Sequence, residues 1–222
     1  MICIPIVAPD TESALKKMAL AELLADVIEI RLDLMETWDV HELIASAARP
    51  VLITYRSKRE GGGGSADYDS RIRLLSRAVA AGAAYVDVEF RIPLEYRKAI
   101  IESRGASEII LSLHLRNGTP SPEKLERLFR KMTATGADIL KIITWARTSE
   151  DNLRVLNLIT RGRALGIRVI AFCMGPMGRI SRIAAPLLGG FMTFASLGAH
   201  EESASGQIPA SQMREMLEIL SS

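Results

Sequence analysis

One lysine in this sequence is set where water is scarce. Segment 136–148, GADILKIITWART, places Lys141 between the apolar pairs 139–140 and 142–143. Burial and neighbouring cations disfavour the charged form of an amine and lower its pKa from the ordinary value of about 10.4. A neutral amine attacks a carbonyl carbon to form an imine, so Lys141 is a candidate nucleophile. The alternative is a structural lysine whose ammonium group reaches water at a strand end.

A histidine lies in the apolar segment that precedes this lysine. His114 is the only one of the three histidines that falls within a predicted strand, 108–115. Imidazole exchanges protons near neutral pH, so a histidine beside an imine-forming lysine can act as a general acid–base. These two residues indicate an enzyme that works through a lysine imine.

The elements that must position these residues alternate along the chain. Apolar segments typical of strands buried on both faces lie at 2–7, 26–33, 50–56, 83–90, 108–115, 138–144, 167–174 and 191–196. Apolar residues three and four apart predict helices between them, including 11–25, 68–82, 121–136 and 149–166, with Ser121-Pro122 and Ser149 as helix starts. Eight such units predict an α/β fold, a closed (β/α)₈ TIM barrel forming a single domain over residues 1–222. An open doubly wound sheet is the alternative, but no early G-x-G-x-x-G supports it.

Polar residues collect towards the carboxyl ends of these predicted strands. They are Glu29, Arg31, Asp33, Arg56, Asp87, Glu89, His114, Lys141 and Thr144. A barrel brings these strand ends together at one mouth, where the active sites of such barrels lie. Five consecutive strands therefore contribute to one predicted site. The alternative for Glu29, Asp33 and Asp87 is an ion pair inside the barrel.

Composition excludes several classes of protein. The chain has 222 residues, 48% of them hydrophobic, and a net charge of +2. The acidic residues are spread throughout, so no basic stripe predicts a nucleic-acid partner. No apolar run reaches the roughly 18 residues of a membrane span, and segment 1–10 does not resemble a signal peptide. Cys3 and Cys173 fall in predicted strands, which favours reduced thiols and a cytoplasmic location.

Six short motifs together resemble one family. EIRLD, TYRSKREGG, LSLHL, ILKII, CMGPMGRISR and SASGQI occur in this order across nearly the whole chain. As a set they resemble type I 3-dehydroquinate dehydratase of the shikimate pathway. The resemblance implies a (β/α)₈ barrel, commonly a homodimer, that uses no metal or cofactor. It also implies the conversion of 3-dehydroquinate to 3-dehydroshikimate through a lysine imine.

The resemblance assigns a role to each matching residue. It implies that Lys141 forms the imine, that His114 is the acid–base group and that Glu60 orients His114. It implies that the substrate's ring hydroxyls contact Glu29, Arg31 and Arg56, and that Arg182 binds the substrate carboxylate. It implies a lid that includes Ser203 and Gln207, an apolar wall at Met174 and a supporting acid at Asp87. Cys3 stands where a serine or threonine is expected, so a polar contact from the first strand is in doubt.

Three segments have a second interpretation. Segment 61–65, GGGGS, resembles a linker, but after REGG it is interpreted as a native mobile loop. Segment 196–209 is a surface loop or, as the SASGQ motif favours, a lid. Segment 174–179, MGPMGR, could bind phosphate at the barrel mouth. For the whole chain, the alternatives are a class I keto-acid aldolase and a non-catalytic barrel that binds a metabolite.

Overall fold

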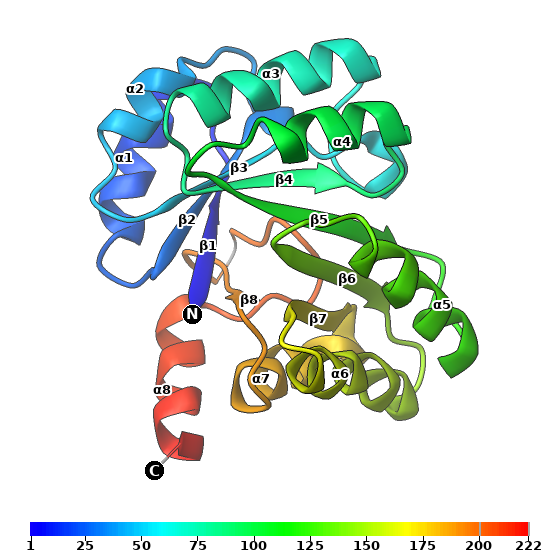
Figure 1. Ribbon diagram of the computed structural model, residues 1–222. Coiled ribbons are helices and arrows are strands. Elements are labelled where there is room, and N and C mark those ends of the chain that lie inside the picture. The colour runs from blue at the N-terminus through cyan, green and yellow to red at the C-terminus, as the bar shows by residue number, and fades with distance from the viewer. Residues whose placement is uncertain (200, 222) are drawn as a thin grey trace.

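Eight parallel strands alternate with helices along the chain (Figure 1). The computed structural model describes residues 1–199 and 201–221. The strands are β1 (Ile2–Ile6), β2 (Val27–Arg31), β3 (Val51–Thr54), β4 (Tyr85–Glu89), β5 (Glu108–Leu115), β6 (Ile139–Trp145), β7 (Arg168–Met174) and β8 (Thr193–Phe194). The helices are α1 (Thr11–Ala21), α2 (Val40–Ala45), α3 (Tyr68–Ala80), α4 (Leu94–Glu102), α5 (Pro122–Thr133), α6 (Ser149–Ala164), α7 (Arg179–Leu187) and α8 (Ala210–Ser221). Each predicted strand segment overlaps an observed strand.

The strands form a barrel that has one seam. Their hydrogen-bonded order is β7-β6-β5-β4-β3-β2-β1-β8, and all the pairings are parallel. In the described chain β7 and β8 form no ladder, although the Phe191 N–H donates to the Val169 carbonyl over 2.8 Å. The predicted (β/α)₈ barrel is confirmed, with this seam as its one opening.

The last strand is shorter than the predicted 191–196. The Ser196 N–H donates to the Ile208 carbonyl (3.0 Å), and the Ala210 N–H donates to the Ser196 carbonyl (2.9 Å). The Ala195 N–H still donates to the Cys3 carbonyl of β1 (3.0 Å), whereas Ser196 pairs with Ile208 and Ala210 instead of with β7. Within that segment, His200 lies outside the described residues.

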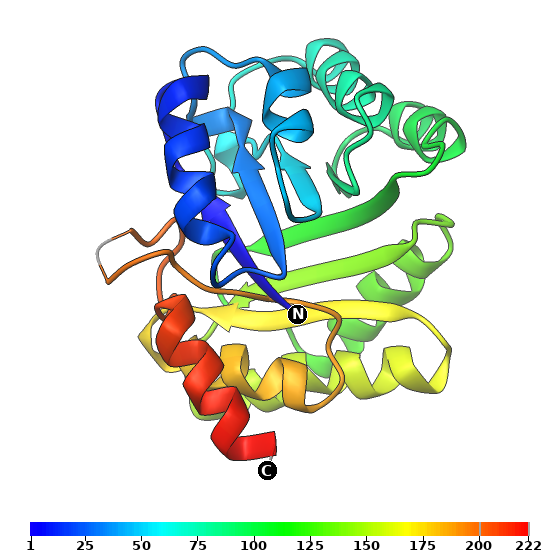
Figure 2. The ribbon, with the colours of Figure 1, turned by 90° about the vertical axis from the view of Figure 1, so that its left-hand side faces the viewer.

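Helices cover the outside of the strands (Figures 1 and 2). The inner strands are buried on both faces, as their apolar sequences predict. Ser121 caps α5 by accepting a hydrogen bond from the Lys124 N–H, whereas α6 is capped by Thr148, one residue before the predicted Ser149. Among the helices of residues 1–199 and 201–221, none combines the length and apolar character needed to cross a membrane.

The four-glycine segment is packed against the polar ends of β2 and β3. The Gly63 N–H donates to Asp33 Oδ2 (3.0 Å), and the Gly64 N–H donates to the Arg56 carbonyl (2.9 Å). A Cβ atom on Gly62 would lie 2.2 Å from the Arg56 carbonyl oxygen. The predicted mobile loop is thus a hydrogen-bonded turn, because its glycines allow the backbone to approach Arg56 closely.

Candidate active site

Alternate residues on six strands face a small cavity at the mouth of the barrel. Its walls are formed by Glu29, Arg31, Thr54, Arg56, His114, Lys141, Ile143, Phe172, Met174, Arg182, Phe194, Ser203, Ala204 and Gln207. Side chains on a strand alternate between its two faces, so residues two apart share the inner face. Nine of the ten predicted site residues therefore lie together, and the tenth, Glu60, lies behind His114.

Lys141 is buried at the inner end of this cavity. It is 4% exposed, and its Nζ lies 3.4 Å from Asp87 Oδ2 and 4.0 Å from Glu29 Oε1. The Nζ atom also lies 4.0 Å from the centre of the Phe194 ring. The predicted cationic neighbours are present, since Arg56 binds the same Asp87 oxygen as Lys141, but the two carboxylates were not expected so close to the amine. Because strands pair in register, Lys141 adjoins Ser112 of β5 and Ile170 of β7.

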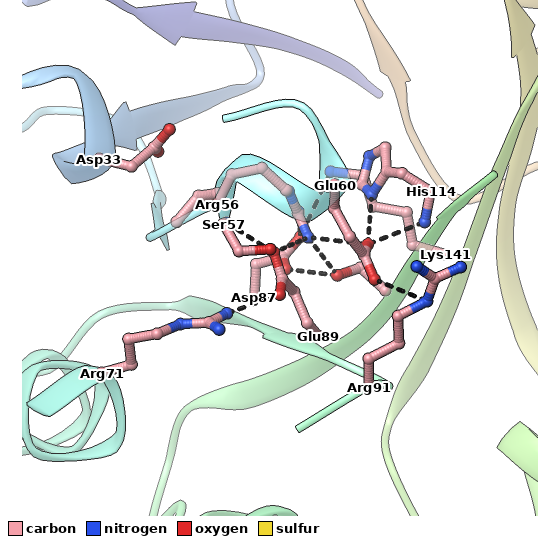
Figure 3. A network of polar contacts seen from close by, with 12 residues as sticks. Asp33, Arg56, Ser57, Glu60, Arg71, Asp87, Glu89, Arg91, His114 and Lys141 are labelled. Carbon is pink, nitrogen blue, oxygen red and sulfur yellow. Dashed lines mark hydrogen bonds and ion pairs between the residues drawn. The ribbon is translucent and has the colours of Figure 1, made fainter. Parts of the chain in front are cut away.

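His114 and Glu60 form a hydrogen-bonded pair beside the lysine (Figure 3). Glu60 Oε2 lies 3.2 Å from His114 Nδ1 and accepts the His114 backbone N–H over 2.9 Å. Burial, reinforced by Arg56 and Lys141, holds the pKa of His114 well below its ordinary value. Burial also raises the pKa of Glu60 to about 7, although Arg56 opposes this. The imidazole is therefore neutral at physiological pH and can accept a proton.

Arg56 connects the carboxylates around the lysine. Its Nη2 donates to Asp87 Oδ2 (2.6 Å), and its Nη1 donates to Ser112 Oγ (2.8 Å) and Glu89 Oε1 (3.4 Å). Its Nη1 also lies 3.7 Å from Glu60 Oε2. Burial opposes the charge on Arg56, but these carboxylates raise its pKa. Arg56 lines the cavity as predicted, yet its hydrogen bonds are directed mainly to this buried network.

Sequence reasoning missed Arg71 and Ser112, which complete the network. Arg71 of α3 donates its Nη2 to Glu89 Oε2 over 2.6 Å, and Ser112 donates to Asp87 Oδ1 over 2.6 Å. Two features of the sequence could have identified these residues. Arg71 lies on the buried stripe of α3 with Leu75 and Ala78, and Ser112 precedes His114 by two residues on β5.

The acidic and basic residues of β2 form two separate pairs. Thr54 donates to Glu29 Oε1 over 2.7 Å. Arg31 donates twice to Asp33, over 2.9 Å and 2.7 Å. Burial acts to raise the pKa of Asp33, but the hydrogen bonds from Arg31 outweigh it and lower this pKa. Asp33 thus supports Arg31, while Glu29 and Arg31 both reach the cavity wall.

Arg182 lines the cavity, and no carboxylate of residues 1–199 and 201–221 forms an ion pair with it. It is 1% exposed, and its guanidinium lies 4.6 Å from the centre of the Phe172 ring. Its Nη atoms donate to the carbonyls of Phe194 (3.4 Å) and Ser205 (3.1 Å), while its Nε has no hydrogen-bond partner. Burial lowers the pKa of Arg182 to about 10. A buried guanidinium that pairs with no carboxylate is suited to an anionic ligand.

Segment 201–209 contributes Ser203, Ala204 and Gln207 to the wall of the cavity. The Ser203 N–H donates to Gln207 Oε1 (2.8 Å), and Gln207 Nε2 donates to Ser203 Oγ (3.2 Å). Both residues line the cavity, as does Met174, and the volume of the cavity is about 60 Å³.

Two predicted polar positions lie outside the cavity. Thr144 shares a hydrogen bond with Thr119 (2.7 Å) and lies 3.3 Å from Cys173 Sγ, so it faces away from the barrel interior. Cys3 is fully buried, and burial raises the pKa of its thiol. Thr144 is thus a structural residue, and Cys3 makes no contact with the cavity.

The glycine N–H groups of segment 174–179 are already hydrogen-bonded within the chain, so they are not available to a phosphate. The Gly175 N–H donates to the Ser205 carbonyl (3.3 Å), and the Gly178 N–H donates to the Gly175 carbonyl (3.0 Å). These hydrogen bonds favour a structural turn over the phosphate interpretation. Within residues 1–199 and 201–221, no group of three or more His, Cys, Asp or Glu is arranged to hold a metal ion.

The fold and the site define a class of protein. The chain is a (β/α)₈ barrel whose mouth holds a buried lysine, a histidine–glutamate pair and an arginine without an acidic partner among the described residues. This combination is typical of a barrel enzyme that uses a lysine amine as its nucleophile. The chain belongs to the type I 3-dehydroquinase family, whose model matches residues 2–222. The family predicted from the sequence motifs is therefore confirmed.

Individual relatives agree with this assignment. The 3-dehydroquinate dehydratase of Desulfotalea psychrophila is 38% identical over 216 residues, covering 96% of this chain and 95% of the relative. The crystal structure of 3-dehydroquinate dehydratase from Geobacillus kaustophilus is 29% identical, with a TM-score of 0.90 over 99% of this chain and 90% of that one. The type I enzyme of Clostridium difficile, solved with covalently modified comenic acid, is 27% identical with a TM-score of 0.87 over 99% and 91%.

Proposed function

We propose that this chain dehydrates 3-dehydroquinate to 3-dehydroshikimate through an imine on Lys141. The observation that carries the proposal is the cavity that Lys141, Arg182 and His114 line together, with His114 paired to Glu60. Membership of the type I 3-dehydroquinase family supports the hydro-lyase class. It also favours a dehydratase over a class I keto-acid aldolase or a non-catalytic barrel, neither of which predicts this family.

In the first half of the reaction, a C–H bond next to the ketone carbon becomes acidic. The Lys141 amine adds to the substrate ketone, and loss of water from the adduct gives an iminium ion. The iminium withdraws electrons from the neighbouring carbon, so a proton there can be removed. His114 takes this proton at Nε2, because Nδ1 is held by Glu60. The product of this step is an enamine.

The second half expels the hydroxyl group. The enamine pushes electrons towards the β-carbon, and the hydroxyl leaves as water after His114 returns the proton. Hydrolysis of the resulting imine releases the product and restores the Lys141 amine. The water used in hydrolysis balances the water lost on imine formation, so one water is removed overall.

The remaining site residues hold the substrate. In this proposal Arg182 binds the carboxylate, because its buried guanidinium lacks an acidic partner. Glu29 and Arg31 contact the ring hydroxyls from β2. Arg56 completes this contact and holds Asp87 beside the lysine. Met174 supplies an apolar wall from β7.

In this proposal, segment 196–209 is a lid, and Ser203 and Gln207 form its inner surface. Their hydrogen bonds to each other give the loop a defined shape above the cavity. Closure excludes water, which would otherwise hydrolyse the imine before elimination. The lid opens to admit the substrate and closes again before the chemistry.

We further propose that the whole chain is one catalytic domain that acts as a homodimer in the cytoplasm, without a nucleic-acid or membrane partner. Two observations support parts of this proposal. Both cysteines are free thiols. Exposed apolar side chains at the end of α7 and on α8, namely Leu187, Leu188, Met216 and Leu220, offer a surface for a second copy. Sedimentation equilibrium would show one or two chains per particle.

Borohydride trapping tests the proposed imine. The full chain is mixed with 3-dehydroquinate and sodium borohydride, and the intact mass and peptide map are recorded. We expect one reduced adduct on Lys141 in the parent chain and none in Lys141→Met. His114→Ala should still give the adduct while product absorbance rises at least about 10²-fold more slowly. An adduct on another lysine, or product without any adduct, would refute the assignment.

A further inference from the structure

A second hollow lies beside the cavity and shares His114 with it. This hollow, here called the basic groove, has a volume of about 1020 Å³ and lies over the carboxyl ends of β5 and β6. Its cationic lining residues are Arg59, Arg91, Arg116, Lys124, Arg147 and Arg154. It is larger than the cavity beneath the lid and comparable to ordinary small-molecule sites.

The groove lining carries more net positive charge than the chain as a whole. Its lining has six cations and one carboxylate, Asp151, which gives a formal charge of +5, whereas the whole chain carries +2. The rest of the chain is therefore net negative, at −3. A concave surface lined by one sign of charge concentrates ions of the opposite sign.

Most of these cations have no acidic partner. In the described part of the chain, no carboxylate is within ion-pair distance of Arg59, Arg116, Lys124 or Arg147. The single carboxylate, Asp151, is buried, pairs with Arg154 and accepts the Arg147 and Thr148 N–H groups. It is therefore unable to neutralise the other charges.

Local structure keeps these side chains at the groove. Arg116 packs over Gly61, where an added Cβ would lie 3.0 Å from its Nε. Arg147 packs over Gly118 in the same way, with 3.5 Å between the added Cβ and its Nε. The capping residues of α5 and α6, Ser121 and Thr148, also line the groove, so two helix amino ends add positive potential.

We propose that the basic groove binds a small polyanion, a molecule with at least two phosphate or carboxylate groups, at a site separate from the cavity beneath the lid. A single carboxylate, such as the one proposed to pair with Arg182, leaves most of the groove charge unmatched. Nucleic acid is a poorer fit, because Trp145 is the only aromatic residue in the groove lining and offers no row of stacking surfaces.

Calorimetric titration with inorganic pyrophosphate tests this site on the full chain. We expect one binding event, weakened about tenfold or more in the double variant Arg116→Gln with Arg147→Gln. The matched control is Arg49→Gln with Arg77→Gln, which removes the same charge near the starts of β3 and β4, at the opposite end of the barrel. The control should change the affinity by less than about twofold.

Further measurements separate the groove from the cavity. Arg182→Met should leave pyrophosphate affinity within about twofold of the parent, since Arg182 lies in the cavity. Turnover of the groove double variant without pyrophosphate should stay near the parent value. Equal weakening in both double variants, loss of binding in Arg182→Met, or tighter binding of single-stranded DNA than of pyrophosphate would each overturn the proposal.

Discussion

At the scale of single residues, two side chains are held in states that cost stability. Glu60 is buried behind His114, where its Oε1 has no hydrogen bond and lies 3.6 Å from Arg91 Nε, and Arg182 is buried with no carboxylate of the described residues within ion-pair distance. Buried charged groups of this kind are uncommon unless a ligand or a reaction uses them. Each therefore leads to a prediction that separates its role in function from its role in folding.

The pH dependence of the reaction should follow the ionisation of Glu60. Burial raises the pKa of Glu60 to about 7, while His114 stays neutral because its pKa is low. Ionised Glu60 accepts the Nδ1–H of His114 and leaves Nε2 free to take a proton. Protonated Glu60 instead donates to Nδ1, which places the imidazole proton on Nε2. We expect kcat/KM to rise with pH through about 7.

Glu60→Gln provides the comparison for this profile. The amide does not ionise, so the rise near neutral pH should disappear and the rate at pH about 8 should fall roughly 10²-fold. Initial rates of product absorbance across the pH range measure both effects. If the variant keeps the rise of the parent chain, a group other than Glu60 controls it.

Arg182→Met should stabilise the free protein and weaken substrate binding. The lowered pKa of Arg182 means that its charge opposes folding at neutral pH, because the unfolded chain holds the proton more tightly. Replacing the charge by an apolar chain should add about 1–3 kcal/mol to the free energy of unfolding. Thermal unfolding without ligand and KM for 3-dehydroquinate measure the two effects. A lower melting temperature combined with an unchanged KM would show that Arg182 is purely structural.

At the scale of elements, α3 is tied to the polar interior of the barrel. Arg71 extends from α3 to Glu89 at the end of β4, and Glu89 also accepts the Ser57 N–H over 2.8 Å. A helix on the outside of the barrel thus holds the loop that carries Glu60. The position of the His114–Glu60 pair depends on this connection as well as on the strands.

A double-mutant cycle tests the link between α3 and β4. Arg71→Leu leaves Glu89 without its shortest ion pair and should cost about 3–5 kcal/mol of unfolding free energy. Adding Glu89→Gln should recover about 1–3 kcal/mol of this loss. Arg73→Leu is the control, because its pair with Asp69 is exposed and 3.8 Å long, and it should cost less than about 1 kcal/mol. Urea unfolding measures Arg71→Leu, Glu89→Gln, the double variant and the control, and additive effects would exclude the link.

The sequence allowed the elements to be predicted better than the network between them. Apolar strand segments and helical spacing are local properties, so all eight strands were located. The site residues on strands followed from their places near carboxyl ends. Arg71 and Ser112 were missed because their role depends on contacts between distant elements. Thr144 was placed at the mouth wrongly, since one position along β6 turns a side chain to the opposite face.

At the scale of the whole molecule, the barrel is closed by ladders everywhere except between β7 and β8. The family and the (β/α)₈ fold are confirmed by the comparisons, but the seam was not foreseen. Its cause is the short β8, after which Ser196 pairs with Ile208 and Ala210 instead of with β7. Arg182 spans this seam, because it stacks on Phe172 of β7 and donates to the Phe194 carbonyl of β8.

Hydrogen exchange should report the seam and its response to ligand. Backbone amides of segment 191–196 should exchange faster than those of β5, which is paired on both sides. Saturating product should slow exchange in segment 191–196 and change β5 little, since the proposed carboxylate contact is at Arg182. Exchange measured by mass spectrometry with and without product gives the comparison. Equal rates in the two segments would contradict a loose seam.

Mechanically, a barrel of this kind is an open ring, and its stiffness depends on what bridges the gap. An anion bound to Arg182 would strengthen the connection between β7 and β8. Each catalytic cycle should therefore stiffen the molecule on binding and relax it on release. Force applied across β7 and β8 should meet less resistance in the empty protein than in the occupied one. The resistance to force applied across β3 and β4, which a ladder joins, should change little when the ligand binds. In this sense the substrate is a temporary structural part of the protein that consumes it.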